Sequence, residues 1–202
     1  ALPNEISGYL QVSGDALLVE NEKHARELKK IRNYVSSRKK KNEFESGFLK
    51  SFGMFYEEAQ KIIELQRQEL AKEQKAGGGE GIYGICHGDY NQHNVLFCRP
   101  GIAVLNFEKA SYDVQAADLG NFMRKILEKH NWDIALGMEM LRAYSDVRPL
   151  SKQEEKQLYI RLGFPEKFWK IANHYFNANK AWVCGRNLEK LEKFICQNED
   201  RE

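Results

Sequence analysis

Residues 82–118 constrain the fold of this 202-residue chain most strongly, because short apolar runs alternate there with dense polar clusters. The apolar runs 82–86, 95–98 and 102–107 have the length of buried strands. His87-Gly88-Asp89 follows the first run directly. Its polar groups are therefore expected in a loop whose ends are fixed by strands, and such loops commonly carry catalytic groups.

A turn signal separates the second apolar run from the third. Arg99-Pro100-Gly101 interrupts them, so residues 94–107 predict a β-hairpin. With the turn centred near Pro100, facing residues have numbers that sum to about 200, which sets Asn94 opposite Asn106 with side chains roughly 5 Å apart. Two oxygen donors beside Asp89 suit a Mg²⁺ ion that also holds phosphate, because Mg²⁺ takes few protein ligands and keeps the rest for water and nucleotide.

The order of these residues resembles the catalytic core of the protein-kinase-like phosphotransferases, and most closely their aminoglycoside and choline kinase branch. Within that branch the chain is similar to the CotS family of spore-coat-associated kinase-like proteins. The helical segments on both sides of the motifs fit the larger lobe of that fold. The motifs that carry the resemblance are His87-Gly88-Asp89-Tyr90-Asn91-Gln92-His93-Asn94, Asn106-Phe107-Glu108, Tyr112-Asp113 and Asp118-Leu119.

The resemblance implies a role for each matching residue. Asp89 would be the base that orients the acceptor hydroxyl, and Asp118 would brace the catalytic loop through His87. Asn94 and Asn106 would contact the nucleotide. The implied cofactors are ATP and Mg²⁺. These few residues could be all that the large lobe needs to contribute to catalysis, because in-line phosphoryl transfer needs mainly positioning and charge neutralisation.

Asn106 is the main departure from the family pattern, which has Asp at this position. The resemblance implies Asn94, Asn106 and Glu108 for the metal. A neutral amide still offers an oxygen to Mg²⁺ but removes one negative charge, and Glu108 is the candidate to supply it. Loss of a charged ligand commonly weakens binding of a hard cation by more than tenfold, about 1.4 kcal/mol.

The predicted architecture is an α+β domain, mostly helical, with a small antiparallel hairpin carrying the catalytic loop. It corresponds to the large, C-terminal lobe of a kinase-like fold over residues 1–202. The predicted parts are a helical segment (1–76), a glycine-rich linker (77–81), the catalytic loop and hairpin (82–118) and a helical subdomain (119–202). Nothing before residue 82 resembles a glycine-rich nucleotide loop or a strand lysine, so the small nucleotide-binding lobe is expected to be absent from this chain.

Hydrophobic periodicity and capping residues predict the helices. Residues 1–19 are expected to be irregular with at most a short helix, and residues 109–113 are expected to form a short connection. The predicted helices are Glu20–Lys41, Glu43 to about Lys75 with Asn42 as its cap, Val114–His130, one capped by Asp133, one from the Ser151–Glu154 capping box to Gly163, Glu166 to about Lys180, and Ala181–Ile195.

Composition narrows the classes of partner. With 31 basic and 29 acidic residues the chain has no bias toward polyanions, and the basic run within residues 20–41 lacks the interleaved aromatics of a base-stacking surface, so no nucleic-acid partner is expected. No apolar run reaches about eighteen residues, which predicts no membrane span. The four cysteines lie among apolar neighbours and are expected to be reduced core residues. The expected location is the cytoplasm, and assembly of the protein into the spore coat is the alternative.

Two functions fit these observations. The first is an ATP- and Mg²⁺-dependent phosphotransferase acting on a small-molecule hydroxyl acceptor. The second is a non-catalytic, pseudokinase-like component of the spore coat, with coat proteins as partners. Asn106 and the missing small lobe favour the second, whereas intact Asp89, Asn94 and Asp118 favour the first.

Overall fold

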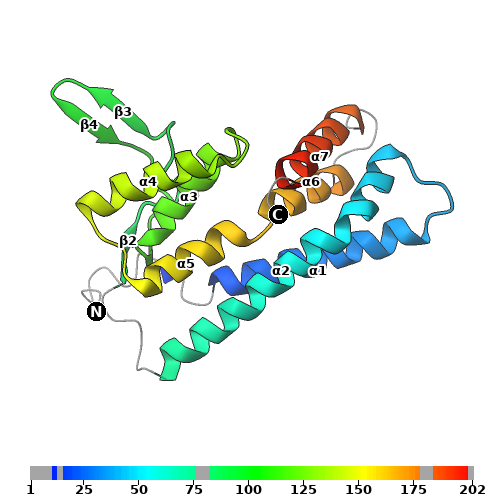
Figure 1. The fold of residues 1–202 in the computed structure, drawn as a ribbon, viewed down its shortest axis with the longest axis horizontal. Helices are drawn as coiled ribbons and strands as arrows, with labels where there is room; N and C mark the ends of the chain where they lie inside the picture. Colours follow the sequence, from blue (N-terminus) through cyan, green and yellow to red (C-terminus); the bar gives the residue numbers. More distant parts are fainter. Residues whose placement is uncertain (1–10, 13–15, 76–81, 178–183, 200–202) are drawn as a thin grey trace. The chain divides into compact units, whose positions relative to one another are not determined.

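The structure is a computed structural model that describes residues 11–12, 16–75, 82–177 and 184–199. They form two compact units, one of Ala1–Ala16 and Gln68–Leu162 (unit 1), the other of Leu17–Arg67 and Gly163–Glu202 (unit 2). Figure 1 labels the helices and the strands β2, β3 and β4. The elements are β1 (Gln11–Val12), α1 (Ala16–Ser37), α2 (Glu43–Lys75), β2 (Tyr83–Cys86), β3 (Val95–Cys98), β4 (Gly101–Val104), β5 (Ser111–Val114), α3 (Ala116–Leu127), α4 (Ile134–Val147), α5 (Lys152–Gly163), α6 (Glu166–Asn177) and α7 (Cys184–Glu199).

Unit 1 contains a three-stranded sheet in the order β1-β5-β2, with β5 antiparallel to β2 and parallel to β1. The predicted connection over residues 109–113 is therefore wrong in its second part, because Ser111–Val114 form the central strand. The charged residue Asp113 made this segment look unlike a strand. Its Oδ1 forms an ion pair with Nη2 of Arg161 in α5, at 2.7 Å, and both side chains are largely buried. The run is also only four residues long, which is too short for a clear period-2 pattern.

The apolar core of unit 1 includes one buried cluster beside the sheet and one among the helices that follow it. Ile82, Val114 and Ala116 form one buried cluster. The buried side of α3 forms the other, together with Leu158 of α5: Leu119, Met123 and Leu127. This is the helical face that the sequence predicts, although α3 begins at Ala116 rather than Val114, whose backbone belongs to β5.

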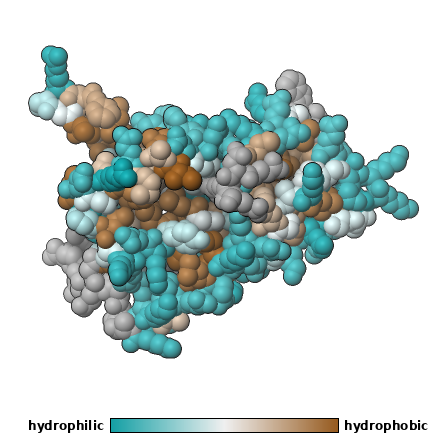
Figure 2. All heavy atoms as spheres, in the orientation of Figure 1, coloured by the Kyte–Doolittle hydropathy of each residue, from teal (hydrophilic) through white to brown (hydrophobic). Residues whose placement is uncertain are grey.

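The predicted hairpin is confirmed as β3–β4, but with a tighter turn. Cys98 pairs with Gly101 and Val95 with Val104, so Asn94 faces Leu105 rather than Asn106. The expectation of buried strands is wrong here, because Phe97 is 85% exposed and most other apolar side chains of the hairpin are exposed too. In Figure 1 the hairpin projects from the rest of unit 1, and Figure 2 shows apolar surface over it.

The predicted helix caps of unit 1 are confirmed. Asp133 accepts hydrogen bonds from the backbone N–H groups of Ala135 and Leu136, at 2.8 and 3.2 Å, at the start of α4. Ser151 and Glu154 form a reciprocal capping box at the start of α5, with N···O distances of 3.2 and 3.0 Å. Both caps supply acceptors for backbone N–H groups that have no hydrogen-bond partner within the first helical turn.

Unit 2 is helical, with α1, α6 and α7 and the first part of α2 around an aromatic core. The predicted cap of α2 is confirmed, because Asn42 Oδ1 accepts a hydrogen bond from the backbone N–H of Glu45 at 2.9 Å. In return, Glu45 Oε2 accepts one from the backbone N–H of Asn42 at 3.1 Å. Apolar residues of α2 at intervals of three and four positions, such as Phe44, Phe48 and Phe55, are buried. Helix α1 runs from Ala16 to Ser37, earlier than the predicted 20–41. The core residues are Leu28, Val35, Phe44, Phe48, Phe55, Phe168, Ile171, Ala172, Leu191 and Phe194.

The cysteine prediction is correct for Cys86 and wrong for two others. Cys86 is buried, and this burial raises the pKa of its thiol to about 12. Cys98 and Cys196 are exposed, the first on strand β3 of the two-stranded hairpin. The predicted linker 77–81 lies outside the described residues. None of the helices in the described ranges combines the length and apolar character of a membrane span.

Candidate active site

The candidate active site is the loop between β2 and β3, which carries the predicted His87-Gly88-Asp89 motif. Gly88 has φ +77°, a backbone conformation that costs glycine little and other residues more. A Cβ atom at this position would lie 2.0 Å from the backbone oxygen of Lys109, well inside van der Waals contact. The loop can therefore approach the chain beyond the hairpin only because residue 88 is glycine.

Asp118 fixes this loop from the first turn of α3. Its Oδ2 accepts a hydrogen bond from the backbone N–H of His87 at 2.6 Å, and its Oδ1 accepts one from Gly88 at 2.9 Å. Asp118 therefore contacts the loop through two backbone donors, whereas the resemblance implied a contact through the imidazole of His87. Hydrogen bonds to a charged acceptor are among the stronger ones in proteins.

The imidazole of His87 ties the loop to the end of the hairpin. Its Nε2 lies 2.7 Å from the backbone oxygen of Leu105, and its Nδ1 lies 3.2 Å from the backbone nitrogen of Asp89. A carbonyl only accepts and a backbone N–H only donates, so Nε2 carries the proton and Nδ1 accepts. The ring is buried and also packs on Phe107, with centroids 4.5 Å apart. These contacts give His87 a positioning role for Asp89.

Asp89 has a carboxylate surrounded by donors. Oδ1 accepts from Lys125 Nζ at 2.7 Å and from Asn91 Nδ2 at 3.1 Å, while Oδ2 accepts from Lys109 Nζ at 3.3 Å. The hydrogen bond from Lys125, followed by that from Lys109, lowers the pKa of Asp89 to about 2. The side chain is 31% exposed. The carboxylate of Asp89 is therefore ionised at neutral pH and partly open to solvent.

Asn94 and Asn106 lie next to Asp89 and contact each other. Asn94 Nδ2 donates to the backbone oxygen of Asp89 at 2.9 Å, and Asn94 Oδ1 accepts from Asn106 Nδ2 at 2.8 Å. Asn106 follows the hairpin with φ +63°, in the left-handed region that asparagine tolerates better than most residues. The two amides meet although the strand register does not place them opposite each other. The structure thus brings Asp89, Asn94 and Asn106 to one place.

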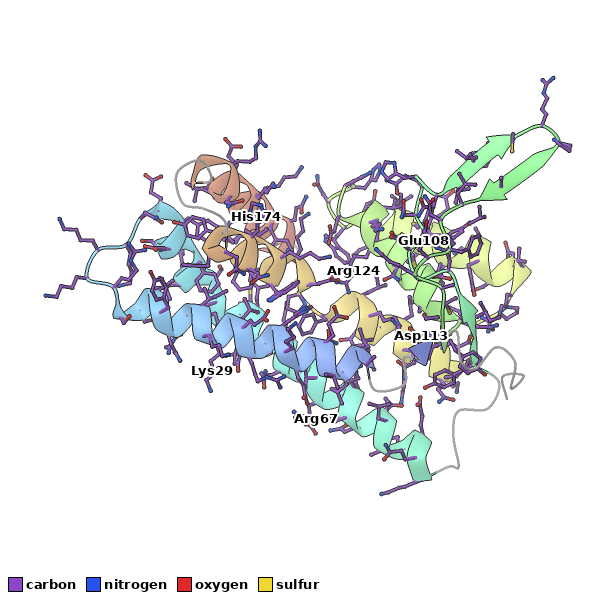
Figure 3. All side chains as sticks on the ribbon, turned by 180° about the vertical axis from the view of Figure 1, so that it is seen from behind. Lys29, Arg67, Glu108, Asp113, Arg124 and His174 are labelled. Carbon is purple, nitrogen blue, oxygen red and sulfur yellow. The ribbon has the colours of Figure 1, made fainter. Side chains whose placement is uncertain are left out.

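The donor set for a metal ion consists mostly of amides. Glu108 is exposed, and Figure 3 shows it near the base of the hairpin, whereas Asp113 lies farther from the hairpin. Within the described ranges, no three His, Cys, Asp or Glu side chains are clustered closely enough to hold a metal ion. The amide oxygen of Asn94 accepts from the amide nitrogen of Asn106, and each residue carries one amide oxygen. Oxygen donors of this kind fit the chemistry of Mg²⁺ when phosphate and water supply the remaining ligands.

Sequence reasoning missed three residues of the site: Asn91, Lys109 and Lys125. A signal for Lys125 was present in the sequence, because it follows Asp118 by seven positions in a predicted helix. Seven positions are about two helical turns, so the two side chains share a face. Once Asp118 is assigned to the loop, Lys125 is expected beside the loop as well.

Known proteins resemble this chain in fold and in sequence. The fold is similar to that of a crystal structure titled aminoglycoside phosphotransferase from Alicyclobacillus acidocaldarius subsp. acidocaldarius DSM 446, with a TM-score of 0.77 and 23% identity over 92% of this chain and 55% of that chain. The sequence is 25% identical to Spore coat protein S of Bacillus subtilis (strain 168) over 121 residues. That match covers 59% of this chain and 34% of the relative, so the chain spans well under two thirds of either protein.

A family model described as "Spore coat putative kinase YutH" matches residues 22–202. The predicted α+β, mostly helical fold and the predicted kinase-like, CotS-related resemblance are both confirmed. Because the match covers most of the sequence, the chain belongs to the spore coat YutH family of kinase-like proteins.

Proposed function

We propose that this chain carries the acceptor side of a phosphotransferase active site that moves the γ-phosphate of ATP to a hydroxyl group of a small molecule. The observation that carries the proposal is the support of Asp89. Its loop is braced by Asp118 at two backbone donors, and its carboxylate is ionised and partly exposed. Such preorganisation is what phosphoryl transfer requires of the protein, because most of its catalysis is positioning and electrostatic stabilisation.

Asp89 orients the acceptor in this mechanism. The acceptor hydroxyl donates a hydrogen bond to Asp89, which directs the hydroxyl oxygen at the γ-phosphorus. A bond from that oxygen to phosphorus forms while the bond to the bridging oxygen of the diphosphate breaks, so ADP leaves with the electron pair. The hydroxyl proton passes to Asp89 and then to solvent. With a pKa of about 2, Asp89 is a weak base, so it acts mainly by orientation and takes the proton late.

Asn94, Asn106 and Glu108 are the residues proposed to hold Mg²⁺ with the nucleotide. The ion, when bound, would neutralise charge on the phosphate oxygens. Asn94 is buried and hydrogen-bonded on both sides of its amide group, so its position is well defined before any ligand binds. Glu108 is the only carboxylate in this proposed set.

A second candidate function is a non-catalytic kinase-like component of the spore coat. It is favoured by the position of Asn106, whose amide nitrogen bonds to Asn94 where the family pattern has a carboxylate. The name of the relative Spore coat protein S points the same way. In this case coat proteins would be the partners, and the protein would pass from the cytoplasm into the coat.

Phosphate transfer by the full-length natural protein separates the two candidates. Release of ADP from ATP should depend on Mg²⁺ and on an added hydroxyl compound, and Asp89→Asn should abolish it. Asp146→Asn, an exposed residue of α4, is the matched control and should leave the rate unchanged. Binding of ATP without any transfer that depends on Asp89 would favour the second candidate. Thermal stability that does not respond to millimolar Mg²⁺ and ATP would contradict the proposal for the first.

A further inference from the structure

Two lysines from different elements meet at the carboxylate of Asp89. Lys125 is anchored on α3, while Lys109 lies in the turn that follows the hairpin. Their Nζ atoms lie 2.7 and 3.3 Å from Oδ1 and Oδ2 of Asp89. Neither lysine has a role in the mechanism above, and among the described residues Asp89 is the polar partner of both. The contacts and charges around Asp89 therefore indicate what the two lysines do.

The hydrogen bonds that Asp89 accepts determine which of its carboxylate oxygens can still bind a substrate. A carboxylate oxygen has two lone pairs. On Oδ1 both are used, by Lys125 and by Asn91, whereas the contacts of the described residues use one on Oδ2. An acceptor hydroxyl would therefore bind at Oδ2, beside Lys109. With an ordinary hydrogen bond, its oxygen would lie no more than about 6 Å from the ammonium group of Lys109.

The charged groups that contact the carboxylate of Asp89 are both positive. Asp89 contributes one negative charge, and the ammonium groups of Lys109 and Lys125 contribute two positive charges. The carboxylate of Asp118 binds the N–H groups of His87 and Gly88 instead, on the α3 side of the loop. An acceptor hydroxyl at Oδ2 would therefore have an ammonium group, that of Lys109, as its charged neighbour on Asp89.

We propose that Lys109 and Lys125 form an anion-binding pair for the acceptor, so that the substrate is a hydroxyl compound that also carries a phosphate or carboxylate group. This inference rests on the proposed phosphotransferase function and names its substrate class. Polycationic acceptors are disfavoured, because their ammonium groups would meet the same two lysines. An anionic group instead gains charge-assisted hydrogen bonds from both.

The exposure of the two lysines suits this role. The side chains of Lys109 and Lys125 are 70% and 44% exposed, so each can turn from Asp89 to a ligand without opening the core. Asp89 remains ionised in either arrangement at neutral pH, because its ordinary pKa already lies far below 7. A ligand anion would therefore share the lysines with Asp89 instead of neutralising it.

The test measures binding of three small hydroxyl compounds of different charge to the full-length natural protein by isothermal titration calorimetry, without ATP. Glycerol 3-phosphate is the anion, glycerol the neutral compound and choline the cation. We expect glycerol 3-phosphate to bind at least about tenfold more tightly than the other two. Lys125→Met and Lys109→Met should each remove most of this preference, and Lys125→Arg should retain it. Lys129→Met, an exposed lysine just beyond α3, is the control for a change of one charge and should bind as the wild type does.

The outcomes separate this inference from the proposed function. Charge-selective binding that depends on the lysines, without any phosphate transfer, supports the anion site and contradicts the phosphotransferase. Equal binding of the anion in wild type and in the Lys109→Met/Lys125→Met double variant overturns the anion site. Transfer to choline that is unaffected by the double variant also overturns it, while the phosphotransferase stands. If ATP displaces glycerol 3-phosphate competitively, the lysines serve the nucleotide phosphates and the assignment to the acceptor is wrong.

Discussion

Asp118 Oδ2 accepts a hydrogen bond from the backbone N–H of His87 at 2.6 Å, which joins the first turn of α3 to the end of β2 across 31 residues of sequence. The other oxygen of the same carboxylate binds the N–H of Gly88 at 2.9 Å. Both donors precede Asp89 directly, so the direction of the Asp89 side chain depends on Asp118. The relationship predicts that Asp118 affects stability and the site together.

Asp118→Ala should lower the free energy of unfolding by about 2–4 kcal/mol, because two partly buried backbone donors lose a charged acceptor. Urea unfolding would measure the change, and hydrogen exchange at the amides of His87 and Gly88 should become faster. Asp146→Asn, on the exposed side of α4, should change stability by no more than about 0.5 kcal/mol. Unchanged exchange at both amides in Asp118→Ala would contradict the bracing role.

Gly88→Ala should destabilise the protein by about 2 kcal/mol or more, because alanine at positive φ is strained and its Cβ would meet the oxygen of Lys109 at 2.0 Å. The measurement is again urea unfolding. Gly101→Ala is the matched control, since a Cβ at Gly101 meets nothing within 4 Å. If the two alanine variants were equally stable, the close approach of the loop to Lys109 would be wrong.

The sequence predicted the elements whose signals are local. The cap at Asn42, the cap at Asp133 and the capping box at Ser151 each set a helix start within a few residues, because side-chain acceptors there bind backbone donors of the same turn. The motif around Asp89 was also local. Its residues follow strands of fixed direction, so their convergence could be expected from the chain order.

The parts that sequence reasoning missed depend on contacts between distant segments. Strand β5 is stabilised by pairing with β2 and by the ion pair from Arg161 to Asp113, 48 residues apart in the chain. The exposure of Phe97 could not be predicted from an apolar run, because the period of a strand does not say whether anything covers it. Lys109 likewise reaches Asp89 only because the loop passes close to it at Gly88.

The pKa of Asp89 provides a titration test of the lysine contacts. Folding lowers this pKa from 3.8 to about 2, mainly through the hydrogen bond from Lys125. A depressed pKa in the folded state stabilises the protein above the unfolded pKa, and this contribution is lost as the pH falls from about 4 to about 2. An NMR titration of the Asp89 carboxyl carbon should give a midpoint near 2 in wild type and a higher one in Lys125→Met. The same midpoint in Lys125→Met and in the control Lys129→Met would contradict the contact.

Asn106→Asp tests the metal proposal with effects of opposite sign. Without Mg²⁺, the new carboxylate faces Oδ1 of Asn94 and cannot donate to it, so the variant should be less stable by about 1 kcal/mol. With Mg²⁺ and ATP, the added charge should tighten Mg²⁺ binding at least about tenfold, or 1.4 kcal/mol. Urea unfolding and calorimetric titration would measure the two effects separately.

The matched control for Asn106→Asp is Asn131→Asp, because Asn131 also has positive φ, at 53°, but follows α3 rather than the hairpin. It introduces the same charge in a similar backbone conformation. We expect it to leave Mg²⁺ binding unchanged, which separates a ligand effect from a general gain of negative charge. Equal Mg²⁺ affinity in wild type and Asn106→Asp would mean that residue 106 is not a metal ligand. Only Asn94 and Glu108 would then remain as proposed protein ligands. Such a site would bind Mg²⁺ more weakly, because this hard cation depends on oxygen ligands.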